Sequence, residues 1–238
     1  MQQDVLPGHT NIDRDYFASE TAKCTLDDWR YEMRREIQEM LPGLYLGPLT
    51  ACRDTEYLNS FGITHIVCLL DAMEAQLFRF LNLQSAFSFF PIQVSDSKTQ
   101  NLIPLFPQIT TFINDTLRRD GKILVCCNGG MSRSPAVVIA YMMETFNLDA
   151  SEAYQYVQSR RLCINPNDAF KTQIAEYEPI YKARKNIATP IEEQRHRRRR
   201  RSDEGDDEED GDTKRRVFEA SHHGDGRIES IFSSVMLP

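Results

Sequence analysis

The chain has 238 residues, 41% of them hydrophobic and 26% charged, which is the composition of a globular protein long enough to bury a core. Its 28 basic and 35 acidic side chains give a net charge of −7, which argues against a dedicated nucleic-acid-binding protein. The longest nearly apolar stretch, residues 136–143, is much shorter than the roughly 20 residues that cross a bilayer. We therefore expect a soluble, intracellular protein without membrane contact, whose six cysteines are reduced thiols.

Two charge runs mark the limit of the predicted domain. Six arginines lie within residues 195–201, and eight acidic residues follow within residues 203–212. Such blocks bury too little apolar surface to offset the entropy of ordering them, so we predict a disordered tail at 184–238. Residues 1–28 are polar and aperiodic and are expected to form a flexible leader, which leaves residues 29–183 as the folded domain. The arginine run is also typical of nuclear localisation signals, so we expect the protein in both cytoplasm and nucleus.

Between these ends, short strand-like runs alternate with helical stretches. β-branched and aromatic residues are concentrated at 63–69, 89–94 and 123–126, which are runs of strand length. Apolar residues recur at helical spacing over 102–117, and residues 136–143 are apolar all round, as in a helix buried in the middle of a domain. This alternation predicts an α/β fold with a mostly parallel central sheet flanked by helices, with ligands at the carboxyl ends of the strands.

Two further helices are predicted from their capping residues. Asp149 with Glu152 has the spacing of a capping box. Asn165 before Pro166 is typical of an N-cap followed by the first helical residue.

The most informative segment follows the run at 123–126. A tight loop leads from the strand into the apolar helix, with the sequence Cys126-Cys127-Asn128-Gly129-Gly130-Met131-Ser132-Arg133-Ser134. The two glycines permit the unusual dihedrals that let backbone N–H groups converge at the helix start, where a tetrahedral oxyanion binds. The guanidinium of Arg133 adds a fork of charge-assisted donors. We therefore predict that phosphate is bound by Asn128, Gly129, Gly130, Met131, Ser132 and Arg133.

The same positive field acts on the sulfur of Cys127. Thiols ordinarily titrate near about 8.5 but are far more acidic beside an arginine at a helix N-terminus, so we expect a thiolate at neutral pH. A thiolate facing a bound phosphate monoester is a nucleophile that would form a phosphocysteine intermediate. Ser134 would donate its hydroxyl to the sulfur and ease its departure. The structural alternative is a buried cysteine followed by a glycine turn and a helix.

This pattern resembles the signature of protein tyrosine phosphatases, in which five residues separate the cysteine from the arginine. The Ser-Arg-Ser form that ends at Ser134 is typical of dual-specificity phosphatases. The resemblance covers residues 29–183 and implies the dual-specificity phosphatase-like fold of the cysteine phosphatases. Within that superfamily the chain is similar to the STYX group, the serine/threonine/tyrosine-interacting proteins. The supporting stretches are residues 33–44, 62–66 and 160–167.

The resemblance makes two positions informative about activity. Vertebrate STYX proteins are known as pseudophosphatases because glycine replaces the nucleophile, whereas this chain has Cys127 at that position. Active members carry a histidine immediately before the nucleophile, and here Cys126 replaces it. A neutral thiol is a weak hydrogen-bonding substitute for imidazole. His65 is the only histidine between residues 10 and 195, and on a predicted strand its expected role is structural rather than catalytic.

A leaving alkoxide or phenolate needs a proton, so a carboxylic acid should reach the loop from a neighbouring strand end. Asp96 follows the run at 89–94 and stands where the resemblance places the general acid. It would protonate the leaving oxygen and then accept a proton from the water that cleaves the phosphocysteine. Asp71, which also follows a predicted strand, is the alternative acid. For Asp96 itself, the structural alternative is a solvated turn residue.

The adjacent cysteines allow two other interpretations. Cys126 and Cys127 could form half of a metal site, but no CxxC pair or histidine-rich partner accompanies them, so we expect no metal. After oxidation they could instead form a disulfide. Such a bond would be strained and easily reduced, because adjacent residues lie closer than the preferred Cα separation.

Two classes of function remain open. The first is a cysteine-dependent protein phosphatase acting on phosphotyrosine and phosphoserine or phosphothreonine, which the intact Cys127, Arg133, Ser134 and Asp96 favour. The second is a STYX-like binding module that captures phosphorylated or unphosphorylated signalling proteins with little or no turnover, which Cys126 and the overall similarity favour. We prefer the enzyme. The resemblance implies phosphorylated protein partners, such as mitogen-activated protein kinases, and no metal or organic cofactor, because the loop and the arginine supply the positive field.

Overall fold

The computed structural model describes residues 12, 16–17, 29–77 and 81–188. The chain divides into two units, residues 1–189 and 190–238. The second unit contains the arginine run, the acidic run and most of the predicted tail, and it lies outside the described residues. Within the described part of the chain, no helix is long and apolar enough to cross a membrane.

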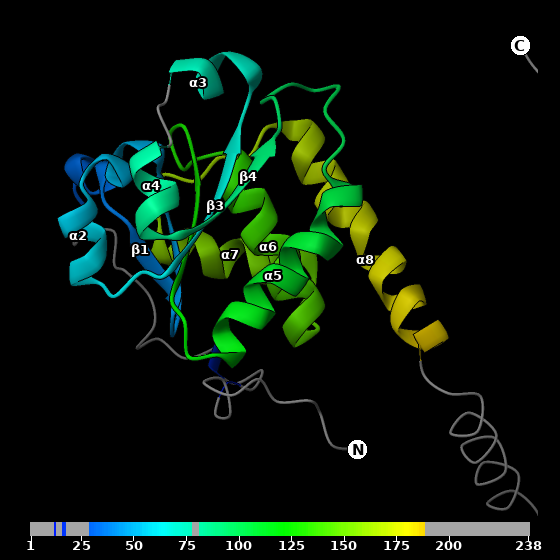
Figure 1. The fold of residues 1–238 in the computed structure, drawn as a ribbon. Helices are drawn as coiled ribbons and strands as arrows, with labels where there is room; N and C mark the ends of the chain where they lie inside the picture. The colour runs from blue at the N-terminus through cyan, green and yellow to red at the C-terminus, as the bar shows by residue number, and fades with distance from the viewer. Residues whose placement is uncertain (1–11, 13–15, 18–28, 78–80, 189–238) are drawn as a thin grey trace, which may run out of the picture. The chain divides into compact units, whose positions relative to one another are not determined.

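A five-stranded sheet forms the centre of the first unit (Figure 1). Its strands lie side by side in the order β1 (Gln38–Leu41), β2 (Leu44–Pro48), β5 (Ile123–Cys127), β3 (His65–Leu70) and β4 (Ser88–Gln93). β1 and β2 pair antiparallel, and the other neighbouring strands pair parallel. The mostly parallel α/β architecture expected from the sequence is confirmed, and the three predicted strands correspond to β3, β4 and β5.

Each helix of the described chain that precedes β4 has at most six residues, and each α-helix that follows β4 has at least 11. They are the 3-10 helices η2 (Tyr31–Arg35), η3 (Leu49–Arg53) and η4 (Ile103–Leu105), and the α-helices α2 (Thr55–Ser60), α3 (Ala72–Leu77), α4 (Leu81–Ala86), α5 (Phe106–Arg118), α6 (Arg133–Phe146), α7 (Ala150–Arg160) and α8 (Asp168–Ala188). Figure 1 shows α5 to α8 grouped apart from α2 and α4.

The two faces of the sheet carry separate cores. Side chains from α5, α6, α7 and α8 form one hydrophobic cluster, and side chains from α2 and α4 contribute to the other. Because successive residues of a strand point to opposite faces, β5 divides its side chains between them. Cys127 belongs to the first cluster and Cys126 to the second. The apolar run at 136–143 lies in α6, and every residue of that run is buried.

Two predictions about helix starts have different outcomes. The capping box of Asp149 and Glu152 is present at the start of α7. The predicted N-cap at Asn165 is wrong, because the Asn167 side chain caps α8 by accepting a hydrogen bond from the Phe170 N–H at 3.0 Å. The N–H of Asn165 instead contacts the loop after β5.

The ends of the folded part also differ from the predicted boundaries. α8 continues to Ala188, so the predicted boundary at 183 falls within a helix. Tyr16 and Phe17 lie in the predicted flexible leader, yet their rings pack against the Tyr156 ring at centroid distances of 6.4 and 4.8 Å. The expectation of an unpacked leader therefore does not hold for these two residues.

Candidate functional site

Cys127 is the last residue of β5 and lies next to the start of α6. The Ser134 hydroxyl donates a hydrogen bond to the Cys127 sulfur at 3.1 Å. Ser134 is fully buried, and only 2% of Cys127 is exposed. The Cys127 sulfur therefore lies beside a hydroxyl donor and the N-terminus of a helix, which are the surroundings expected from the sequence for a nucleophilic sulfur.

The loop after Cys127 is held by hydrogen bonds to its carbonyl groups. The Asn128 carbonyl accepts one from the Leu49 N–H at 3.2 Å, and the Met131 carbonyl accepts one from the Asn165 N–H at 2.7 Å. Both donors are backbone groups that lie outside the loop, beyond β2 in one case and before α8 in the other. The first and the last carbonyl of the loop are therefore fixed in direction.

The two glycine carbonyls between them are held by Arg161. Its Nε donates to the Gly130 carbonyl at 2.9 Å, and its Nη2 donates to the Gly129 carbonyl at 3.3 Å. In a planar trans peptide the N–H points opposite to the C=O. Because all four carbonyls bind groups outside the loop, the loop N–H groups are turned inward.

Several of these inward donors have no acceptor within the described residues. The N–H of Gly130 is used in a turn, where it donates to the Cys127 carbonyl at 3.2 Å. The donors without an acceptor in the described chain are the backbone N–H groups of Gly129, Met131, Ser132 and Arg133. The buried Nε of Arg133 also has no hydrogen-bond acceptor among the described residues. Buried donors are normally satisfied, and a tetrahedral oxyanion offers the acceptors that these groups need. The arrangement fits the phosphate site predicted from the sequence.

Gly130 is the loop position where the backbone requires glycine. Its φ is +63°, and a Cβ there would lie 2.5 Å from the carbonyl carbon and oxygen of Gly47 in β2. A Cβ at Gly129 would meet only the flexible Met131 side chain, at 3.2 Å. Glycine at 130 therefore allows the loop to pack directly on β2.

The guanidinium of Arg133 is fixed by Glu74 of α3. Nη1 and Nη2 donate to the two carboxylate oxygens at 2.5 and 2.8 Å, and Nη1 also donates to the Val94 carbonyl at 3.1 Å. Burial raises the pKa of Glu74, but the hydrogen bonds and charge of Arg133 outweigh burial and leave that pKa below its usual value. The paired hydrogen bonds fix the plane of the guanidinium and leave its Nε–H and one N–H of Nη2 for a further acceptor.

Asp96 follows β4 and reaches the loop through Ser132. Its Oδ1 accepts hydrogen bonds from the Ser132 hydroxyl and from the Asn167 side-chain amide, each at 2.8 Å. The Ser132 hydroxyl in turn accepts a hydrogen bond from the Asn167 N–H at 3.2 Å. The exposed carboxyl group of Asp96 is thus held at the start of α6, where it can exchange a proton with a molecule bound in the loop.

Asp71, the alternative acid, has a different position. Its Oδ1 accepts a hydrogen bond from the Glu74 N–H at 2.7 Å, and its own N–H donates to the Glu74 carboxylate at 2.9 Å. This reciprocal pair caps α3 and positions Glu74 against Arg133. The geometry favours Asp96 over Asp71 as the proton donor, and that role of Asp96 stays a prediction.

Three residues of the site were not predicted from the sequence: Glu74, Arg161 and Asn167. Arg161 and Asn167 lie in the stretch 160–167 that supports the family resemblance, so that stretch was a signal for them. Glu74 is one of the 35 acidic residues of the chain, and no sequence pattern distinguishes it.

Cys126 lies in a separate thiol cluster on the other face of the sheet. Its sulfur is 3.8 Å from that of Cys52, and Cys68 is its register partner in β3. The Cys52 and Cys68 thiols, together with complete burial, raise the pKa of Cys126 well above its usual value. A disulfide between Cys126 and Cys127 would require two side chains on opposite faces to meet. Among the described residues, no group of three or more His, Cys, Asp or Glu is placed to bind a metal.

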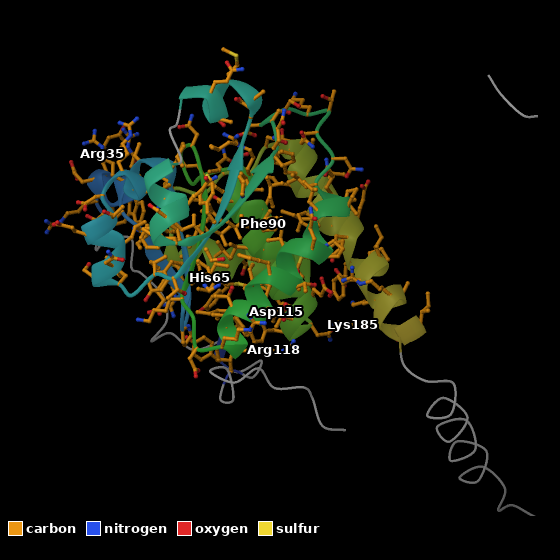
Figure 2. All side chains as sticks on the ribbon, in the orientation of Figure 1. Arg35, His65, Phe90, Asp115, Arg118 and Lys185 are labelled. Atoms are coloured by element: carbon orange, nitrogen blue, oxygen red, sulfur yellow. The ribbon has the colours of Figure 1, made fainter. Side chains whose placement is uncertain are left out.

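His65, labelled in Figure 2, lies at the opposite end of the paired strands β3 and β5 from the loop after Cys127. It is the first residue of β3 and pairs with Ile123, the first residue of β5, whereas Cys127 is at the other end of that strand. Its ring packs against the Phe112 ring at 5.7 Å, and burial lowers its pKa. The structure thus gives His65 a packing role.

Known proteins are similar to this chain in sequence and in fold. The family model for the dual specificity phosphatase catalytic domain matches residues 44–180. The mouse serine/threonine/tyrosine-interacting protein is 43% identical over 177 residues, which cover 73% of this chain and 79% of that protein. Human dual specificity protein phosphatase 22 is 34% identical over 146 residues, which cover 61% of this chain and 76% of that protein. The crystal structure of the human tyrosine phosphatase-like serine/threonine/tyrosine-interacting protein matches with a TM-score of 0.59 and 45% identity, over 62% of this chain and 98% of that one.

Gly130→Ala is expected to distort the loop, because the added Cβ overlaps the Gly47 backbone and the residue is held at positive φ. We expect the free energy of unfolding to fall by about 1–3 kcal/mol in urea titrations. Calorimetry should also show tungstate binding weakened by about tenfold or more, which corresponds to roughly 1.4 kcal/mol. Gly129→Ala is the matched control and should show much smaller effects. Equal effects of the two substitutions would contradict this account of the loop.

Glu74→Gln removes the charge of the Arg133 partner and keeps its shape. Because the pKa of Glu74 is lowered in the folded protein, its carboxylate stabilises the fold above the ordinary value of 4.5, and this contribution is lost as the pH falls through the folded-state value. The difference in melting temperature between wild type and variant should be full at neutral pH and shrink below about pH 4.5. Glu178→Gln, at an exposed pair with Lys182, is the control. A difference that stays constant down to the acid range would rule out this role for the carboxylate.

Proposed function

The chain belongs to the dual-specificity phosphatase family, and from this membership we propose that it is a cysteine-dependent protein phosphatase. Its substrates are phosphotyrosine and phosphoserine or phosphothreonine in proteins, and the reaction passes through a phosphocysteine intermediate. One observation carries the proposal: the Cys127 sulfur accepts a hydrogen bond from Ser134 at the N-terminus of α6. There the N–H groups of Gly129, Met131, Ser132 and Arg133, and the Nε of Arg133, have no acceptor in the described chain.

In the first step, the Cys127 thiolate attacks the phosphorus of the bound monoester, and the bond from phosphorus to the leaving oxygen breaks. Asp96 donates a proton to that oxygen as it departs. The loop N–H groups and Arg133 stabilise the charge on the three equatorial oxygens. Glu74 keeps the guanidinium in the required plane.

In the second step, a water molecule attacks the phosphocysteine and Asp96 accepts its proton. The bond from sulfur to phosphorus breaks, and the sulfur leaves as a thiolate. The Ser134 hydroxyl, 3.1 Å from the sulfur, stabilises the charge that returns to it. Inorganic phosphate is released, and the free enzyme is regenerated.

Phosphorylated signalling proteins are the proposed substrates, and mitogen-activated protein kinases are the candidates that we favour. A pocket of about 570 Å³, lined by residues that follow β3 and by residues in and after β4, is the space that we assign to the polypeptide around a phosphorylated residue. Two of its lining residues are close to partners of Arg133. Asp71 exchanges hydrogen bonds with Glu74, and Ser95 follows Val94 in sequence. The lining residues are Asp71, Ala72, Met73, Gln93, Ser95 and Gln100. We also propose that the protein is both cytoplasmic and nuclear, on the basis of the arginine run at 195–201.

The second candidate function is a binding module that captures phosphoproteins with little or no turnover. Two observations favour it. The residue before the nucleophile is Cys126, whose side chain points to the opposite core and cannot support the loop. Relatives that share 43% identity are named as interacting proteins. The two candidates differ in one measurable step, the breaking of the bond from phosphorus to oxygen.

Hydrolysis of an aryl phosphate by the purified chain separates the two functions. If the chain is a phosphatase, wild type should hydrolyse the aryl phosphate. Cys127→Ser should then lower turnover by at least about 10³-fold, because the nucleophile is removed. Cys68→Ala, which removes a buried thiol from the opposite face of the sheet, should retain activity within about threefold of wild type. Equal rates for wild type and Cys127→Ser would exclude the enzyme and leave the binding module.

The choice between Asp96 and Asp71 can be tested with two leaving groups. Asp96→Asn should lower kcat for phenyl phosphate by about 10²-fold, because this poor leaving group needs a proton. The loss of kcat should be smaller for p-nitrophenyl phosphate, because its leaving group departs more readily without protonation. Asp71→Asn retains a capping side chain and should change neither rate by more than about threefold. The opposite pattern would assign the acid to Asp71.

A further inference from the structure

Arg161 is a fully buried arginine that directly follows α7. Its guanidinium donates five hydrogen bonds, each to an oxygen atom of a neutral group. Two of these bonds reach the loop after Cys127, as described above. Buried arginines are rare, and such complete use of the guanidinium is the arrangement that burial requires.

The other three hydrogen bonds reach residues 34–38, at the end of η2 and the start of β1. Nη2 donates to the Arg34 carbonyl at 2.7 Å, and Nη1 donates to the Glu36 carbonyl at 2.9 Å and to the side-chain oxygen of Gln38. The side chain therefore joins the loop to the end of η2 and the start of β1. A loop fixed to the sheet in this way cannot turn its glycine peptides without breaking bonds on both sides.

Arg161 also carries a charge that no carboxylate within the described residues balances. Burial lowers the pKa of its guanidinium, and the nearby sulfurs of Cys163 and Cys127 oppose that effect. An arginine remains protonated in proteins. A fixed positive charge therefore lies behind the loop, and a Cys127 thiolate or a bound oxyanion is the negative charge that complements it.

Alternative supports for the two glycine carbonyls are lacking in the described chain. Gly129 and Gly130 accept side-chain hydrogen bonds there from Arg161 alone. Cys126, the residue that precedes the nucleophile, points into the other core as a neutral thiol. The support of the loop thus falls to a residue more than 30 positions away.

We propose that Arg161 is a positioning residue for the reaction proposed above. It holds the Gly129 and Gly130 carbonyls outward, so that the loop N–H groups face the oxyanion, and its charge stabilises the Cys127 thiolate. The role is deduced for the proposed phosphatase, but it concerns loop geometry and sulfur reactivity, which can be measured without turnover.

Three variants of the full chain test the proposal: Arg161→Met, Arg161→Lys and, as a control, Arg160→Met. Arg160 is adjacent and carries the same charge, but its guanidinium lies over the Tyr156 ring instead of contacting the loop. Alkylation of Cys127 by iodoacetamide, followed by mass spectrometry from pH 5 to 9, reports the thiolate fraction. Protection of Cys127 from alkylation by tungstate reports the oxyanion site. Circular dichroism establishes that each variant is folded.

Arg161→Met should slow Cys127 alkylation at pH 6 by about tenfold and weaken tungstate protection by about tenfold or more. Arg161→Lys keeps the charge but cannot fill five acceptors, so it should retain most of the alkylation rate while tungstate protection weakens about fivefold. Arg160→Met should match wild type in both assays. A folded Arg161→Met with wild-type alkylation and protection overturns the proposal.

If Arg161→Met does not fold, Arg161→Lys provides the test. Tungstate protection as strong as in wild type would then overturn the proposal. Failure of the proposed phosphatase function can be distinguished from failure of the positioning role of Arg161. Loss of protection in the Arg161 variants, in a chain whose wild type hydrolyses no aryl phosphate, supports the positioning role and removes the phosphatase. Undiminished turnover by Arg161→Met removes the positioning role and leaves the phosphatase.

Discussion

The outward direction of four consecutive carbonyl groups, from Asn128 to Met131, is the constraint on which the site depends. Their hydrogen-bond donors come from the end of β2, the end of α7 and the segment before α8. These segments are brought to the loop only when the sheet and its helices have assembled. The site is therefore a product of the whole domain, although its donors are a few adjacent peptide groups. The same constraint explains why a glycine with positive φ lies against β2.

The proposed oxyanion binding and the proposed covalent chemistry depend on different atoms of this site. The donors are backbone N–H groups and the Arg133 guanidinium, and none of them needs the Cys127 sulfur. Only the attack on phosphorus requires it. A phosphatase and a phosphoprotein-binding module are therefore compatible with one loop geometry, and the chemistry of a single side chain separates them. The pleat of β5 keeps that sulfur apart from the neighbouring Cys126, which has the environment of an ordinary core thiol.

Local sequence was sufficient to predict the central part of the site. The strand, the glycine loop and the buried helix are consecutive, so the spacing from Cys127 to Ser134 places the sulfur, the hydroxyl and Arg133 together without knowledge of the fold. The mostly parallel sheet also followed from the alternation of strand-like and helical runs. β1 was missed because it is short and begins with two polar residues, and β2 because it is short and ends in glycine and proline, which are rare inside strands.

The residues that support the loop could not be predicted in the same way. Glu74 and Arg161 are distant in sequence from the residues that they hold, and only tertiary packing brings them together. Arg161 also contradicts the usual rule that charged side chains lie at the surface. Its burial becomes intelligible only when the five oxygen acceptors are known.

A crystal structure of the protein with bound tungstate tests the central claim most directly. The account predicts the tetrahedral anion in contact with the Cys127 sulfur, accepting hydrogen bonds from the N–H groups of Gly129, Met131 and Ser132 and from Arg133 Nε, with Arg161 still bound to both glycine carbonyls. Tungstate bound elsewhere on the domain, or a loop whose carbonyls turn toward the sulfur, would contradict it.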